Sequence, residues 1–278
     1  MSDVEKTVRE FYEKVGWVKE GGCLGEDRLF RQFSPPAHGY LGKVNARTIA
    51  CFSGLSGRLL LAGGGDIPES HIRIASAFSR ITCLDISQRA LDIAKERLGR
   101  NVECILGSIL DISLPDDSFD AVLCAHVIYH VDEELQERAV NELIRVTKQG
   151  CRVVVIYRNP DSMPLRLMAI KNRLPLLWRL RRRSTVVSAG SAAPEESPPP
   201  LYFAAHPLSW WHRFESKCRV TLMPWIVMGN EEEEHLLWFD AMAAVVYRLC
   251  SWFERAYPRL AVKWWSYPLI VLDKSEGH

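Results

Sequence analysis

The sequence has no excess of charge and no long apolar run, and each absence excludes a class of protein. Lysine and arginine number 35 against 34 aspartates and glutamates, so the formal net charge at pH 7 is +1. This balance argues against nucleic acid as a partner, since such proteins are usually basic overall. No stretch matches the roughly 20 apolar residues of a membrane span, and residues 1–10 are too polar for a secretory signal. We therefore expect a cytoplasmic protein.

Cysteine motifs and nucleotide-loop motifs are also missing. The eight cysteines are scattered, with no C-x-x-C pair and no cysteine–histidine cluster of zinc type. Several lie inside apolar runs, which is typical of buried reduced thiols. No G-x-x-x-x-G-K-[ST] loop for a nucleoside triphosphate is present. We expect neither a metal site nor a disulfide framework.

Short apolar runs alternate with amphipathic stretches through the middle of the chain. Such an alternation is typical of a parallel sheet covered by helices on both faces. Ligands of these sheets bind beyond the carboxyl ends of the strands, so residues at those ends should share one rim. The expected strands are 59–62, 81–85, 102–106, 119–124 and 151–157, and the expected helices are 71–78, 88–98 and 133–147.

Two further regions flank this core. The apolar spacing predicts helices over 4–15 and 40–52, which would form an N-terminal cap. After the core, we expect strands near 220–227 and 267–272 and one long helix over 233–254. We divide the chain into a cap (1–56), a cofactor-binding core (57–158), a basic insert with a flexible loop (159–206) and a part that completes the sheet (207–278).

A glycine turn and a carboxylate carry the strongest ligand signal. Gly63, Gly64 and Gly65 follow the first expected strand, and Asp85 ends the next one. Glycines allow a sharp turn and close approach of a ligand, and a carboxylate at that strand end accepts ribose hydroxyls. Asp85 as a simple helix cap is the alternative. Pro68 stands where a dinucleotide fingerprint has its third glycine, which favours S-adenosylmethionine over NAD.

These residues stand in the order and spacing of the class I S-adenosylmethionine-dependent methyltransferase motifs, which the sequence resembles from about residue 59 to 157. It looks especially like bacterial small-molecule and glycan methyltransferases. The resemblance implies a Rossmann-like sheet, mostly parallel with an antiparallel last strand, an N-terminal helical cap and helical insertions in the C-terminal part. The motifs that carry it are 59–65, 83–87, 107–109, 114–120, 126–131 and 142–146, with 11–12, 16–17, 202–207 and 267–270 outside the core.

The resemblance also assigns the cofactor's neighbours. Asp85 would hold the ribose, while Ile86, Ser108 and Ile109 would surround the adenine. The family usually has an acid where Leu61 stands, and often one in place of Ser108, and both are absent here. The full cofactor set implied is Gly63, Gly64, Gly65, Asp85, Ile86, Ser108, Ile109 and Ala125.

His126 is the candidate base or substrate contact, because it directly follows a strand end on the ligand rim. The expected reaction is methylation, on oxygen, of a small-molecule, sugar or lipid-linked acceptor. Two alternatives stay open: a protein that binds the cofactor and catalyses a rearrangement or cyclisation, and a non-catalytic binding protein. Candidate substrate residues, for several of which plain packing is the alternative, are Tyr12, Trp17, Tyr40, Tyr129 and His206.

Residues 163–183 combine apolar side chains with seven lysines and arginines. A lid or a contact with another subunit is our first interpretation of this segment. The second is a peripheral contact with an anionic membrane surface, which basic amphipathic segments favour.

Overall fold

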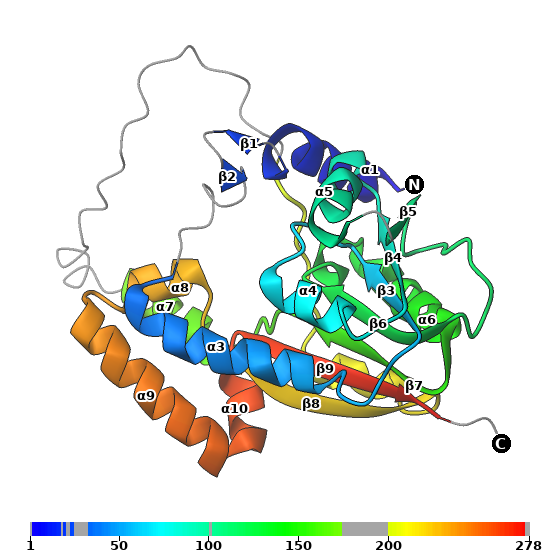
Figure 1. Ribbon diagram of the computed structural model, residues 1–278. Coiled ribbons are helices and arrows are strands. Elements are labelled where there is room, and N and C mark those ends of the chain that lie inside the picture. The colour runs from blue at the N-terminus through cyan, green and yellow to red at the C-terminus, as the bar shows by residue number, and fades with distance from the viewer. Residues whose placement is uncertain are drawn as a thin grey trace.

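The computed structural model describes residues 2–17, 19–20, 23–24, 33–99, 102–173 and 200–275. Most of the expected basic and flexible segment, residues 174–199, therefore lies outside the described residues. The described part forms one seven-stranded sheet in the order β5-β4-β3-β6-β7-β9-β8, together with a short pair of strands, β1 (Lys19–Glu20) and β2 (Cys23–Leu24) (Figure 1).

The sheet is mixed, with a single reversed strand. β9 runs antiparallel to both of its neighbours, β7 and β8, while the other neighbouring pairs are parallel. The prediction of a mostly parallel Rossmann-like sheet with an antiparallel last strand is confirmed. The strands are β3 (Arg58–Ala62), β4 (Arg80–Asp85), β5 (Val102–Leu106), β6 (Phe119–Ala125), β7 (Thr147–Ile156), β8 (Cys218–Ile226) and β9 (Tyr267–Lys274).

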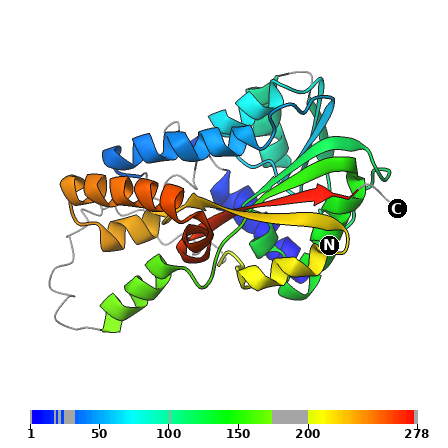
Figure 2. The ribbon, with the colours of Figure 1, turned by 90° about the horizontal axis from the view of Figure 1, so that it is seen from below.

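Alternate residues of the central strand β3 feed two separate cores. Leu59 and Leu61 pack with residues of α3, α4 and α5, whereas Leu60 and Ala62 pack with residues of α6 and η5. This division follows from the two-residue period of a strand, and it covers both faces of the sheet with helices (Figure 2). The helices are α3 (Pro35–Ala50), α4 (Glu69–Ala75), α5 (Gln88–Leu98), α6 (Gln136–Val146) and the 3₁₀ helix η5 (Leu208–Phe214).

A helical group, α3 with the C-terminal insertions α7 (Met163–Arg173), α8 (Asn230–Leu236) and α9 (Asp240–Ala256), projects beyond one end of the sheet (Figure 2). The expectation of one long helix over 233–254 is wrong, because the backbone is extended at Leu237 and Phe239. The break lets Leu237 enter the core while Glu232 and Glu233 of α8 stay buried against other partners. A further short helix, α10 (Pro258–Trp264), leads into β9.

Of the two helices expected in the N-terminal cap, the second belongs to α3 and packs against α4, α9 and β8. The first is α1 (Asp3–Phe11), followed by a π-helical turn, η1 (Tyr12–Gly16), and we keep the name cap for these two elements. Ser2 and Glu5 form a reciprocal capping box that fixes the start of α1. The cap lies beside α5, near the carboxyl ends of β4 and β5 (Figure 1). It therefore covers the rim on which the sequence places the cofactor.

Two further properties bear on the expectations. All seven cysteines whose side chains are described are free thiols, and four of them are buried. No single helix in the described ranges is long and apolar enough to cross a membrane; α8 and α9 pass that test only as a pair, and they meet at a bend of 119°.

Candidate functional site

The glycine turn joins β3 to α4 and requires its glycines. Gly63 and Gly65 have φ angles of 71° and 56°, in the left-handed region that disfavours other residues. The N–H of Gly63 donates to the carbonyl of Leu84 at 2.7 Å, which ties the turn to the end of β4. A Cβ on Gly63 would collide with Val127. The loop after β6, which carries His126 and Val127, is therefore in direct contact with the glycine turn.

Asp85 faces this turn from the end of β4. Its Oδ1 accepts a hydrogen bond from Ser87 N–H at 2.8 Å, and its Oδ2 accepts one from Gly65 N–H at 3.4 Å. Burial raises the pKa of Asp85 to about 6, although the backbone N–H groups of Ser87, Gly65 and Ile86 oppose that rise. Asp85 is therefore ionised at neutral pH, and the burial of its charge lowers the stability of the folded protein.

A second carboxylate reaches the neighbouring strand end from the cap. Glu5 of α1 is buried and accepts a hydrogen bond from the hydroxyl of Ser108, whose Oγ in turn accepts one from Leu110 N–H at 3.0 Å. Ile109 beside it is buried. The acid that is missing at position 108 is thus supplied from another element, and no local pattern in the sequence signals it. Leu61, by contrast, is buried in the core and brings no carboxylate.

The π-helical turn η1 closes over the glycine turn. The ring of Trp17 would lie 3.2 Å from a Cβ on Gly65, and Tyr12 stacks on Trp17 with ring centroids 4.9 Å apart. Glu13 holds η1 in place by accepting hydrogen bonds from Ser87 Oγ and Gln88 N–H, both at 2.9 Å. Tyr12 and Trp17, two of the candidate substrate residues, therefore lie at the rim beside the glycine turn.

His126 follows Ala125 at the end of β6 and has a φ of 62°. Its Nδ1 is 2.8 Å from the hydroxyl of Tyr129, so the two side chains form a pair. Burial, helped by the nearby His71, His130 and Arg158, lowers the pKa of His126 to about 3. The imidazole is therefore neutral at physiological pH.

Three residues outside the candidate site set surround this histidine. The rings of Trp225 and Tyr267 each have centroids 5.3 Å from that of His126. Arg158 lies 4.6 Å above the Tyr267 ring and pairs with the buried Glu232 at 2.5 Å. Arg158 directly follows the expected strand 151–157. Because ligands bind beyond the carboxyl ends of such strands, its position in the sequence could have predicted it as a site residue. Glu232 could not be predicted in this way, because it lies in helix α8 and not at the end of a strand.

The other two candidate substrate residues are Tyr40 and His206. Tyr40 is buried, stacks on Tyr247 and donates a hydrogen bond to Glu254 at 2.5 Å, and its hydroxyl lies 3.2 Å from the backbone carbonyl of Trp225, so it packs in the interior behind that residue. His206 stacks on Trp210, and its backbone N–H donates to the hydroxyl of Tyr157 at 2.9 Å. The structure brings together Tyr12, Trp17 and Tyr129 near the rim but leaves Tyr40 and His206 in other surroundings.

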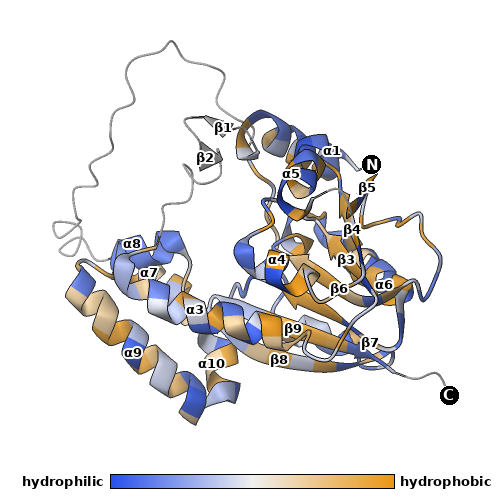
Figure 3. Cartoon of the chain, viewed as in Figure 1, coloured by the Kyte–Doolittle hydropathy of each residue, from blue (hydrophilic) through white to orange (hydrophobic). Residues whose placement is uncertain are grey.

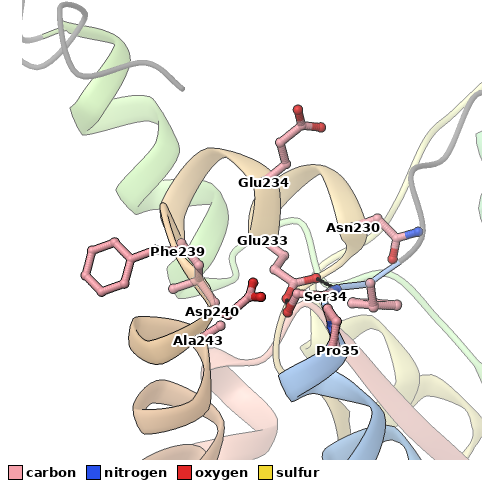
Figure 4. A pocket seen from close by; sticks show the side chains of 10 residues that line it. Ser34, Pro35, Asn230, Glu233, Glu234, Phe239, Asp240 and Ala243 are labelled. Atoms are coloured by element: carbon pink, nitrogen blue, oxygen red, sulfur yellow. Dashed lines mark hydrogen bonds between the residues drawn. The ribbon is translucent and has the colours of Figure 1, made fainter. Parts of the chain in front are cut away.

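A cavity of about 220 Å³ lies elsewhere, between α3, α8 and α9 (Figure 4). Glu233 points into it and accepts a hydrogen bond from Ser34 N–H at 3.2 Å. None of its lining residues belongs to the glycine turn or to the His126 cluster. Among the described residues, no group of three histidines, cysteines or acids is placed to hold a metal ion.

The strand order, the glycine turn after β3 and the acid that ends β4 together define a class I S-adenosylmethionine-dependent methyltransferase fold. Residues 62–155 match the family model described as a methyltransferase domain.

Similar proteins agree with this assignment of the fold. The chain is 30% identical over 170 residues to a demethylmenaquinone methyltransferase of Thermobifida fusca, covering 58% of this chain and 64% of that protein. N-methyltransferase NodS of Bradyrhizobium japonicum, crystallised with S-adenosylhomocysteine, matches 98% of this chain and 99% of its own with a TM-score of 0.54 and 13% identity. Geranyl diphosphate C-methyltransferase of Streptomyces coelicolor matches 98% of both chains with a TM-score of 0.54 and 15% identity.

The chain spans between about half and just under two thirds of the length of the first curated relatives it matches. The solved structures share the fold, and S-adenosylmethionine is the cofactor of this class. The residues of the rim fit that group. A buried carboxylate at the end of β4 suits a ribose diol, and the glycine backbone and the apolar Ile109 suit its uncharged parts.

Cofactor affinity is expected to depend on pH through Asp85. Because burial raises its pKa to about 6, the charged acceptor is present above pH 6 and is lost as pH falls through that value. The dissociation constant for S-adenosylmethionine should therefore be flat from pH 8 to 7 and rise by up to about tenfold per unit below 6. Calorimetry at several pH values checks this. An affinity unchanged down to pH 5 would show that the Asp85 carboxylate does not hold the ligand.

Proposed function

We propose that the protein transfers the methyl group of S-adenosylmethionine to an oxygen of a small-molecule acceptor, a sugar or lipid-linked molecule being the expected class. The observation that carries the proposal is the neutral His126, paired with Tyr129 at 2.8 Å, on a loop pressed against the glycine turn. A hydroxyl acceptor must lose a proton during the reaction, and a neutral imidazole at the rim can accept it.

The chemistry supplied by the bound cofactor is a methyl group on a positively charged sulfur. The chain's task is to align the acceptor oxygen and to exclude water. A lone pair of that oxygen forms the new C–O bond as the C–S bond breaks, and the hydroxyl proton passes to His126. Its pKa of about 3 keeps the imidazole unprotonated before transfer but also makes it a weak base, so the proton passes to it only as the C–O bond forms and the acceptor oxygen becomes strongly acidic.

The surroundings of His126 favour an acceptor with an apolar part. Trp225 and Tyr267 offer ring surfaces beside the imidazole, while the charge of Arg158 is already paired with Glu232. Two of the similar proteins are named for demethylmenaquinone and geranyl diphosphate, which supports a small-molecule acceptor without identifying it.

One feature favours a second candidate, a protein that binds the cofactor without transferring its methyl group. Leu61 is fully buried where the family usually has an acid, so one anchor for the cofactor's amino group is missing. Loss of such a charge-assisted bond costs on the order of 2 kcal/mol, which weakens binding without abolishing it.

Release of S-adenosylhomocysteine separates the two candidates. The protein is incubated with S-adenosylmethionine and a panel of sugars, polyprenyl-linked sugars and aromatic alcohols, and product is quantified by mass spectrometry. We expect S-adenosylhomocysteine and O-methylated product in equal amounts for at least one acceptor. Cofactor binding with no S-adenosylhomocysteine from any acceptor would contradict transfer and support the second candidate.

A further inference from the structure

Helix α9 carries its one buried acid on the side that faces the protein. Glu254 forms an ion pair with Arg47 at 2.7 Å and accepts a hydrogen bond from the indole N–H of Trp265 at 2.6 Å. Ala243 and Tyr247 lie buried on the same side of the helix. Residues 241–264 contain no other acid, so their single carboxylate is neutralised inside the molecule.

The opposite side of α9 is apolar and exposed. Val245, Leu249 and Trp252 are 58%, 59% and 55% exposed, and their spacing of four and three residues aligns them along one side of the helix. Past the end of α9, Tyr257 is 50% exposed and lies beside Trp252 with ring centroids 6.1 Å apart, and Trp264 of α10 is 37% exposed. Single exposed apolar residues are ordinary, but a stripe of them aligned on one helix and continued at its end marks a contact surface. Figure 3 shows the mixed hydropathy of α9 and α10 residue by residue.

After Asp240, the exposed acid at the start of α9, the exposed charges along the two helices all have one sign. Within residues 241–264 they are Arg248, Arg255, Arg259 and Lys263, and none of the four forms an ion pair with a described residue. Arg248 and Arg255 each lie three residues after a member of the apolar stripe, so they border it. We call this surface of exposed apolar and basic residues over 245–264 the α9–α10 face. Its positive charge is local, since the whole chain is nearly neutral.

We propose that the α9–α10 face docks on the surface of an anionic phospholipid bilayer. The apolar stripe enters the boundary between headgroups and acyl chains, and the four cations meet lipid phosphates, as in interfacial amphipathic helices. Tryptophan and tyrosine suit that boundary because they are apolar bodies with one polar atom. The helices lie on the membrane and do not cross it, because Glu254 anchors α9 to the protein interior.

A second copy of the chain is a weaker occupant. In a symmetric dimer through this face, the unpaired cations of both copies would be brought together, and like charges oppose such pairing. The sequence placed a membrane contact in residues 163–183, of which the structure describes only up to Arg173. The α9–α10 face is a separate surface, and its docking does not depend on the proposed methyl transfer.

Vesicle flotation of the full chain tests the proposal. We expect the protein to float with vesicles of equal parts phosphatidylcholine and phosphatidylglycerol, and to stay behind with phosphatidylcholine alone. The double variant Leu249→Gln/Trp252→Gln should lower partitioning by about tenfold or more, since it removes the two largest exposed apolar groups of α9. The variant Arg248→Gln/Arg255→Gln should remove the preference for the anionic lipid.

Leu106→Gln is the matched control, because Leu106 is 51% exposed but lies on β5, far along the chain from α9. It should float like the unmodified protein, and calorimetric affinity for S-adenosylmethionine should be the same in the unmodified protein and both α9 variants. Absence of flotation, or flotation that neither variant reduces, would overturn the proposal. So would a dimer in vesicle-free ultracentrifugation that Leu249→Gln/Trp252→Gln dissociates.

Discussion

Replacing Asp85 by asparagine is expected to weaken S-adenosylmethionine binding by about a hundredfold, because two charge-assisted hydrogen bonds to the ribose lose their acceptor charge. The same change should stabilise the ligand-free protein. Burial raises the pKa of Asp85 from 3.8 to about 6, so the folded state binds a proton more tightly than the unfolded state. The stability that the protonated acid contributes is present below pH 3.8 and is lost as pH rises through 6.

At neutral pH the ionised Asp85 therefore costs stability on the order of 3 kcal/mol, which an uncharged side chain relieves. Asparagine can still accept the hydrogen bond from Ser87 N–H, although its amide suits the weak contact with Gly65 less well. A melting temperature raised by a few degrees, together with weaker binding of S-adenosylmethionine, would show that Asp85 lowers the stability of the protein but is needed to bind the cofactor. An Asp85→Asn protein that melts lower and binds normally would show that the residue is only a helix cap.

Replacing His126 by asparagine is expected to lower kcat by about a hundredfold to a thousandfold on any acceptor that is found, with cofactor affinity unchanged. Asparagine is the suitable replacement, because it tolerates the φ of 62° that His126 adopts. Because the imidazole is the only group removed, a lower kcat would show that it accepts the proton of the acceptor hydroxyl. Steady-state kinetics and calorimetry on the same preparation measure both quantities.

Tyr129→Phe provides the control for His126. It removes the hydroxyl that orients the imidazole at 2.8 Å but leaves the ring nitrogen in place, so a smaller loss of kcat is expected. Because the pKa of His126 is about 3, kcat at saturating cofactor should not fall between pH 8 and 5 through this residue. A His126→Asn protein with full kcat would remove His126 from the reaction.

The sequence predicted the elements that local pattern determines. Apolar runs such as 59–62 and 151–157 are strands, and the glycine turn and Asp85 lie together as expected from the topology of parallel sheets. The break at Leu237 was missed, because helical spacing continues across it in the sequence and tertiary packing decides where the chain turns. The spacing of apolar residues predicts that a segment is helical, but it does not predict which buried residues the helix will contact.

Two of the residues missed at the site, Glu5 and Glu232, depend on contacts between distant segments. Glu5 reaches Ser108 across 103 positions, and Glu232 reaches Arg158 across 74. No pattern within one element signals such a pair. The interior position of Tyr40 depends on such a contact too, since its partner Glu254 lies 214 positions later.

Calorimetric titration of the full chain with S-adenosylmethionine and S-adenosylhomocysteine tests the central claim most directly. The account predicts one site for each ligand, with affinity that falls below pH 6 and is about a hundredfold weaker in the Asp85→Asn protein. No binding of either ligand at millimolar concentration, by a protein that melts cooperatively, would contradict it.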